Sequence, residues 1–157
     1  MLAKPSRKGG FTLLELVIVV VIIGIIAAIA VPRMSRASAG ASDKALAGDL
    51  AVLRNAIDMY GAEHNGTYPA AATIVDQLTL WTDNNGATAD APDPNHIYGP
   101  YIRSSPPLPV GAKKGNTGIA AADAAGVGWI YTATTGAIRA NCDANEVDVT
   151  GTAYSDY

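Results

Sequence analysis

A single carboxylate, that of Glu15, lies near the start of an apolar run that extends from Phe11 to Val31. A charge at the centre of a membrane helix costs about 2.5 to 3.5 kcal/mol, and less near the helix end, where it reaches the interface. An unpaired carboxylate inside a protein core without water would cost far more. The chemistry that Glu15 requires is therefore neutralisation by a cation, and the apolar run itself contains none.

The sequence lacks the motifs that are typical of enzymes. The chain has two histidines, His64 and His96, and lacks the Walker, G-x-G-x-x-G and G-x-S-x-G motifs. Ser104, His96 and an aspartate form a triad only on paper, so we expect no enzymatic activity. Cys142 is the only cysteine, which excludes an internal disulfide and a thiolate metal cluster. We expect its thiol to be buried.

The apolar run is long enough to span a membrane. Its 21 residues, at about 1.5 Å each, match a bilayer core of about 30 Å. The run exceeds the roughly 7 to 15 apolar residues of a cleaved signal peptide. It nevertheless ends in Ala28-Ile29-Ala30, an A-x-A sequence at which signal peptidase could release a soluble binding domain beginning at Val31. The run alone leaves both interpretations open.

An amphipathic helix is predicted beyond Pro32, a residue that predicts a kink in a continuing helix. Apolar residues then recur at helical spacing over about residues 42–64, and Asn65-Gly66 ends the pattern. Residues 11–64 therefore predict one long, bent helix, apolar all round at first and amphipathic later. The apolar stripe consists of Leu46, Leu50, Leu53, Ile57 and Tyr60, and the other faces carry Asp43, Lys44, Asp49, Arg54, Asp58 and Glu63.

The rest of the chain predicts a small head, which makes the fold class α+β. Residues 74–81 predict a short helix, and residues 128–142 predict a β-hairpin that turns at Thr135-Gly136. The amphipathic half of the long helix is expected to pack on this sheet. Residues 83–100 and 111–128 are expected to be loops, and residues 104–111 an extended proline-rich connector.

The charge distribution argues against nucleic acid as a partner. The net charge is -3, and the basic residues Lys4, Arg7 and Lys8 precede the apolar run, so the part behind it is more acidic. A strongly basic patch, the usual footprint of nucleic-acid binding, is missing there.

The stretch KGGFTLLELVIVVVIIGIIAAIAVP resembles the amino-terminal signature of type IV pilin-like proteins. The resemblance implies cleavage between Gly10 and Phe11 by a prepilin peptidase and methylation of the new Phe11 amine. It implies that the apolar helix is retained, first in the membrane and then in the centre of a helical filament. Glu15 would pair there with the Phe11 amine of a neighbouring subunit, and Pro32 would kink the helix.

Residues 45–69 resemble the major, G-type pseudopilins of type II secretion systems. The resemblance is carried by Asp58, Tyr60, Asn65, Tyr68 and Pro69. The segment YGPYIRSSPPLP is similar to a proline-bearing segment of that group, but the typical aspartate-proline-tryptophan-glycine run is not present. A pilin of a type IV pilus, acting in adhesion, motility or DNA uptake, is therefore kept as the alternative.

The resemblance also implies an organisation and a location. Residues 1–10 would be the leader, 11–32 the membrane and filament-core helix, 33–66 its amphipathic continuation, and 67–157 the head. The subunit would cross the inner membrane once, with its head in the periplasm. Its filament would help to move folded proteins across the outer membrane. The implied partners are copies of itself, minor pseudopilins, the prepilin peptidase, membrane lipid before assembly, and an assembly platform with a separate ATPase.

Calcium is the one cofactor that the resemblance suggests. G-type pseudopilins often bind calcium in a carboxy-terminal loop, and this chain has oxygen ligands of the right kind near its end. Their spacing matches no recognised calcium loop. The candidate ligands are Asp143, Glu146, Asp148 and Asp156.

Overall fold

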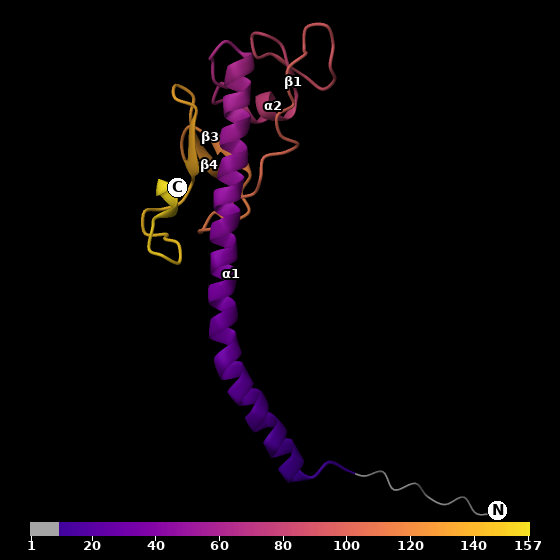
Figure 1. Cartoon of the computed structure of the whole chain (residues 1–157), viewed down its shortest axis with the longest axis vertical. Helices are drawn as coiled ribbons and strands as arrows, with labels where there is room; N and C mark the ends of the chain where they lie inside the picture. Colours follow the sequence, from indigo (N-terminus) through magenta and orange to yellow (C-terminus); the bar gives the residue numbers. More distant parts are fainter. Residues whose placement is uncertain (1–9) are drawn as a thin grey trace, which may run out of the picture. The chain divides into compact units, whose positions relative to one another are not determined.

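The computed structural model describes residues 10–157, except the side chains of residues 31–37. The predicted leader therefore lies outside the described residues, apart from Gly10. The chain divides into two compact units, Met1–Ser38 and Ala39–Tyr157. The elements, labelled in Figure 1, are α1 (Leu13–Glu63), α2 (Ile74–Thr79), β1 (Trp81–Thr82), β2 (Thr88–Ala89), β3 (Gly118–Ala120), β4 (Val127–Thr132), β5 (Ala137–Ala140) and the 3-10 helix η1 (Tyr154–Asp156).

Helix α1 joins the two predicted helical segments into one element of 51 residues that passes through Pro32. It ends where the sequence indicates, because Asn65 and Gly66 adopt positive φ values of 56° and 80°. The Gly66 N–H then donates to the Gly61 carbonyl at 2.8 Å and closes the last turn. The kink at Pro32 stays a prediction, since its side chain lies outside the described set.

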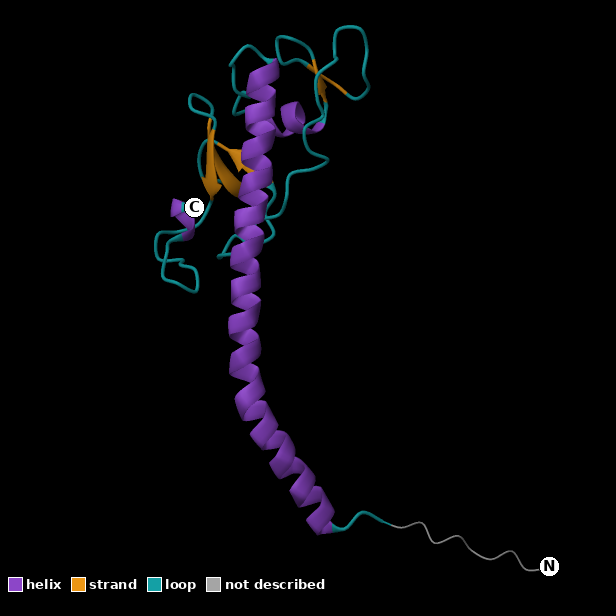
Figure 2. Ribbon diagram, viewed as in Figure 1, coloured by secondary structure: helices purple, strands orange, loops and turns teal. Residues whose placement is uncertain are grey.

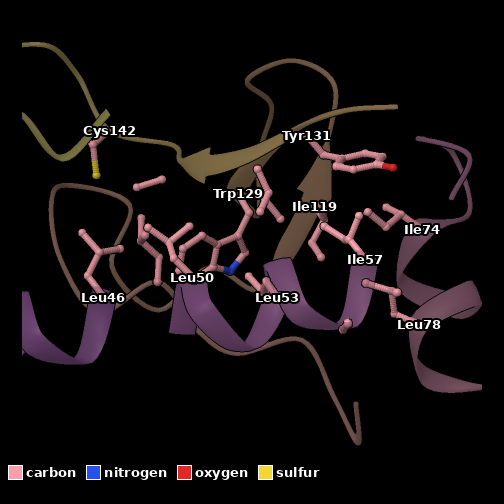
Figure 3. Close-up of a cluster of buried hydrophobic side chains, with 14 of the residues drawn as sticks. Leu46, Leu50, Leu53, Ile57, Ile74, Leu78, Ile119, Trp129, Tyr131 and Cys142 are labelled. Atoms are coloured by element: carbon pink, nitrogen blue, oxygen red, sulfur yellow. The ribbon is translucent and has the colours of Figure 1, made fainter. Parts of the chain in front are cut away.

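In the second unit, the apolar stripe of α1 packs on a three-stranded sheet and on α2 (Figures 2 and 3). The strand order is β3-β4-β5, with β4 antiparallel to β5 and parallel to β3. Trp129 and Tyr131 lie on one face of β4 and are fully buried under the stripe, whereas Ile130 between them is half-buried. The predicted helix-on-hairpin core is confirmed. The stripe residues are Leu46, Leu50, Leu53, Ile57 and Tyr60, all at most 3% exposed.

The structure corrects the predicted loop at residues 111–128 and places part of the proline-rich connector in the core. Residues 111–128 contain β3, whose Ile119 pairs with Trp129 and enters the core. The proline-rich connector also contributes to the core, because Leu108 and Val110 are buried and the Trp129 indole donates to the Pro106 carbonyl at 2.8 Å. Neither segment has a periodic apolar pattern of its own. Each takes its position in the core through contacts with the β-hairpin.

The short helix is also shorter than predicted. Helix α2 ends at Thr79, and Trp81 begins the two-residue strand β1. Within the predicted loop 83–100, Thr88 and Ala89 form β2, which pairs with β1. The Thr82 N–H also donates to the Tyr98 carbonyl at 2.9 Å. Strand β1 therefore forms backbone hydrogen bonds both with β2 and with the end of this loop.

Cys142 is a free cysteine that is 8% exposed, as the sequence predicted. Burial, and then the neighbouring Glu146 carboxylate, raise the pKa of its thiol to about 11. Near pH 8, roughly one thiol in a thousand is then ionised. We expect an alkylating reagent to modify the folded protein at least about a hundredfold more slowly than the denatured chain. The rate should rise about tenfold per pH unit. Equal rates in the folded and denatured chains would contradict this prediction.

Candidate assembly site at the start of the long helix

The first unit presents an apolar helix surface that the described chain does not cover. The segment Leu13–Ala30 has a mean hydropathy of 3.2, none of it is buried, and it is long and apolar enough to cross a membrane. Phe11 is 82% exposed, and the large apolar residues from Leu13 to Ile29 are all more than 40% exposed. Exposure of so much apolar surface to water is unfavourable. Lipid or other protein chains must therefore cover this helix.

Glu15 lies in the first turn of α1, where it forms a reciprocal capping box with Thr12. The Thr12 N–H and hydroxyl donate to Oε2 of Glu15 at 2.8 and 2.7 Å. The Glu15 N–H is 3.2 Å from the Thr12 hydroxyl oxygen, which accepts its hydrogen bond. This arrangement satisfies two of the N–H groups that a helix start leaves without partners. One carboxylate oxygen of Glu15 thus caps the start of the helix in its own chain.

The other carboxylate oxygen of Glu15 is left for a different partner. In the part of the chain that the structure describes, every hydrogen bond to this carboxylate reaches Oε2 and comes from Thr12. The nearest position at which a cation can arise is Phe11, four residues earlier, whose amide becomes an amine when the Gly10-Phe11 bond is cut. The site can therefore keep its cap and still accept a positive charge at Oε1.

Gly10 and Phe11 precede α1 in non-helical, exposed backbone. A Cβ atom built on Gly10 meets no other atom within 4 Å, and its φ is outside the left-handed region. The packing of this chain therefore does not require glycine at position 10. Any requirement for it must come from a molecule that binds this segment.

Thr12 is the residue that the sequence analysis missed. Threonine followed three residues later by glutamate, just before an apolar run, is the capping-box pattern that would have identified it. The apolar run drew attention to Glu15 as an isolated charge. The structure shows instead that Glu15 already has one local partner.

Substitution of Thr12 tests the cap directly. We expect Thr12→Val to remove the hydroxyl that accepts from the Glu15 N–H and donates to the Glu15 carboxylate, and to weaken the helix start by about 1 kcal/mol. Amide hydrogen exchange at Glu15, measured in detergent micelles, should then be about fivefold faster. Thr12→Ser keeps the hydroxyl and should exchange like the unmodified protein. Equal exchange in the Val and Ser variants would contradict the cap.

The four candidate calcium ligands do not converge. Glu146 accepts from the N–H groups of Asp143 and Ala112, whereas Asp148 accepts from Thr150, Thr152 and Tyr157. Within the described residues, the only hydrogen bond to the Asp156 carboxylate comes from the Ser155 hydroxyl, at 3.4 Å. Among residues 10–157 outside the undescribed side chains, no group of three or more His, Cys, Asp or Glu side chains is placed to hold a metal ion.

Comparison with known proteins identifies the family. Residues 5–31 match the family model described as a prokaryotic N-terminal methylation motif. The chain is 38% identical over 109 residues to the type II secretion system core protein G of Aeromonas hydrophila, covering 69% of this chain and 71% of that protein. The chain belongs to the type II secretion system core protein G family. This is the family of major pseudopilins, so the predicted resemblance to G-type pseudopilins is confirmed.

Other core protein G relatives support the same membership. Identity is 35% over 109 residues with the protein of Vibrio cholerae, covering 69% of each chain. It is 33% over 107 residues with that of Klebsiella pneumoniae, covering 68% of this chain and 72% of the relative. No solved structure matches the chain.

Membership in the core protein G family favours a filament subunit over the two alternatives. A type IV pilus pilin shares the methylation motif, but the relatives named above are pseudopilins. A soluble domain released after Ala30 would discard the segment that the motif covers. The family is one of structural subunits, and together with the exposed apolar helix it fits a subunit anchored in a membrane.

Proposed function

We propose that this pseudopilin is the repeating subunit of a filament in a type II secretion machine, and that Glu15 controls its assembly. The observation that carries the proposal is the Glu15 carboxylate, which has one oxygen bound by Thr12 and stands in a fully exposed apolar helix. A helix of this kind becomes a filament core when many copies pack side by side. The filament acts mechanically and helps to move folded proteins across the outer membrane.

Processing creates the partner of Glu15. A prepilin peptidase cuts between Gly10 and Phe11, and the new Phe11 amine is methylated and stays positively charged. The accessible, uncrowded backbone at Gly10 supports cleavage there. The helix itself is retained, so the charge and the carboxylate enter the filament together.

Pairing occurs between subunits. In the filament core, where water and lipid are excluded, each Glu15 accepts the Phe11 amine of a neighbour at its Oε1 oxygen. Burial of a charge without a partner costs several kcal/mol, whereas a buried pair is close to neutral in net stability. The pair therefore selects the correct register between neighbouring subunits, because subunits that are out of register bury both charges without partners.

The remaining partners follow from the same proposal. The head lies in the periplasm, the filament forms in the periplasm or reaches the cell surface, and lipid covers the apolar helix before assembly. Minor pseudopilins and an inner-membrane platform with a separate ATPase assist assembly, and the kink at Pro32 adapts the helix to the core. The test is the assembly of Glu15 variants in cells that carry a type II secretion machine, with membrane insertion measured in parallel.

A further inference from the structure

The residues after β5, here called the carboxy-terminal loop (residues 143–157), are fastened to α1. The anchor is Asp43, a carboxylic side chain that is only 6% exposed. One of its oxygens accepts from the Tyr154 hydroxyl at 2.8 Å, and the other accepts from the Val149 N–H at 3.2 Å. Farther along α1, the Arg54 guanidinium donates to the main-chain oxygen of Tyr157 at 2.7 Å.

Asp148 closes the loop on itself. Its Oδ1 accepts from the Thr150 N–H and hydroxyl, both at 2.7 Å, and from the Thr152 N–H at 2.9 Å. Its Oδ2 accepts from the Tyr157 hydroxyl. The hydrogen bonds from Tyr157 and then Thr150 lower the pKa of this carboxyl far below its usual range.

Glu146 connects the start of the loop to the segment after the proline-rich connector. Its Oε1 accepts from the Ala112 N–H, and its Oε2 accepts from the Asp143 N–H at 2.8 Å. These two N–H groups lower the pKa of the Glu146 carboxyl. Both oxygens of Glu146 are therefore occupied by donors from two different parts of the chain.

This donor set does not fit calcium. The ion takes about 6 to 8 oxygen ligands at roughly 2.3 to 2.6 Å. Every carboxylate oxygen of Asp148 and Glu146 already accepts at least one hydrogen bond from an N–H or O–H group, whose hydrogen carries part of the positive charge that a cation would supply. The two carboxylates also share no donor.

We infer that the carboxy-terminal loop of this pseudopilin is closed by hydrogen bonds in place of calcium. Hydrogen bonds to Asp148 close the loop on itself, and Glu146 connects it to residue 112. The hydrogen bonds from Tyr154 and Val149 to Asp43, here called the lock, hold the loop on α1. The loop of the head then folds without a metal ion. In this respect the chain differs from the calcium-binding pseudopilins that it resembles.

The first test compares the full chain in detergent with calcium and with a chelator. Both tryptophans, Trp81 and Trp129, lie in the second unit, so their fluorescence reports unfolding of the head. We expect the same Tm in millimolar calcium and in excess EGTA. Hydrogen exchange at the Val149 and Thr152 amides should also be the same in both. A Tm that falls with EGTA and recovers with calcium would overturn the inference.

The second test removes one hydroxyl of the lock. Tyr154→Phe deletes the donor to Asp43, and we expect the Tm to fall by about 3 to 6 °C without calcium dependence. Tyr98→Phe is the matched control, because Tyr98 is also half-buried and no hydrogen bond to its hydroxyl occurs among the described residues. If the two variants melt together, or if Tyr154→Phe has the Tm of the unmodified protein, the lock does not hold the loop.

Discussion

Replacement of Glu15 by alanine is expected to abolish filament formation while membrane insertion is retained. Loss of the carboxylate leaves the methylated Phe11 amine of a neighbour buried without a partner. Removal of one member of a buried ion pair costs about 3 to 5 kcal/mol, and each 1.4 kcal/mol is about tenfold in an association constant. Assembly should therefore weaken by more than about two orders of magnitude per contact. Electron microscopy of sheared filaments and the membrane fraction measure the two properties separately.

Glu15→Gln separates the charge from the cap. Glutamine at the third helical position can complete a capping box with Thr12 as glutamate does, but it cannot neutralise an amine. If pairing between subunits is the function of Glu15, the Gln variant fails to assemble like the Ala variant. Normal filaments from Glu15→Gln would show that assembly needs only the local cap. Normal filaments from Glu15→Ala would show that assembly needs neither the cap nor the pairing between subunits.

Replacement of Gly10 by valine is expected to leave the leader attached. A Cβ at this position has no neighbour within 4 Å in the part of the chain that the structure describes, so the new side chain has room there. The head should therefore fold normally and the helix should insert. The peptidase, however, must accommodate the side chain beside the bond that it cuts. We expect the precursor to accumulate, heavier by the leader, with no filaments formed because no Phe11 amine exists.

Gly48→Ala is the matched control for this substitution. Gly48 lies on an exposed position of α1, and a Cβ there also meets no atom within 4 Å. This variant should be processed to the same extent as the unmodified protein. Complete processing of Gly10→Val, measured by intact mass, would contradict cleavage after Gly10.

The parts of the fold that the sequence predicts are those with a strong local period. The stripe from Leu46 to Tyr60 defines both the helix and its buried face, and the two apolar or β-branched runs on either side of Thr135-Gly136 define the hairpin. Helix termination at Asn65-Gly66 is likewise a local property of the left-handed backbone. Each of these features depends on residues only a few positions apart.

The parts that sequence reasoning missed depend on distant partners. Strand β3 has three residues and exists through its pairing with β4. Asp43 lies outside the apolar stripe that the sequence predicts, yet it is buried, and Tyr154 and Val149, more than a hundred residues away, donate to it. No pattern within a short window can reveal such contacts.

At the assembly site, the sequence predicted the charges but not their local geometry. The resemblance to the type IV pilin-like signature points to Gly10, Phe11 and Glu15. The cap from Thr12 was missed because the carboxylate was treated as having no local partner. Pairing between subunits involves a second copy and an amine that arises only on processing, so it stays a proposal.

The account depends on an apolar helix that survives processing and carries a new amine close to Glu15. Mass spectrometry of the amino-terminal peptide from protein isolated from the membrane fraction tests this most directly. We predict a chain that begins at Phe11 and is heavier by one methyl group on its amine. A mature chain that begins at Val31 would contradict the account, because Glu15 and the helix around it would have been discarded.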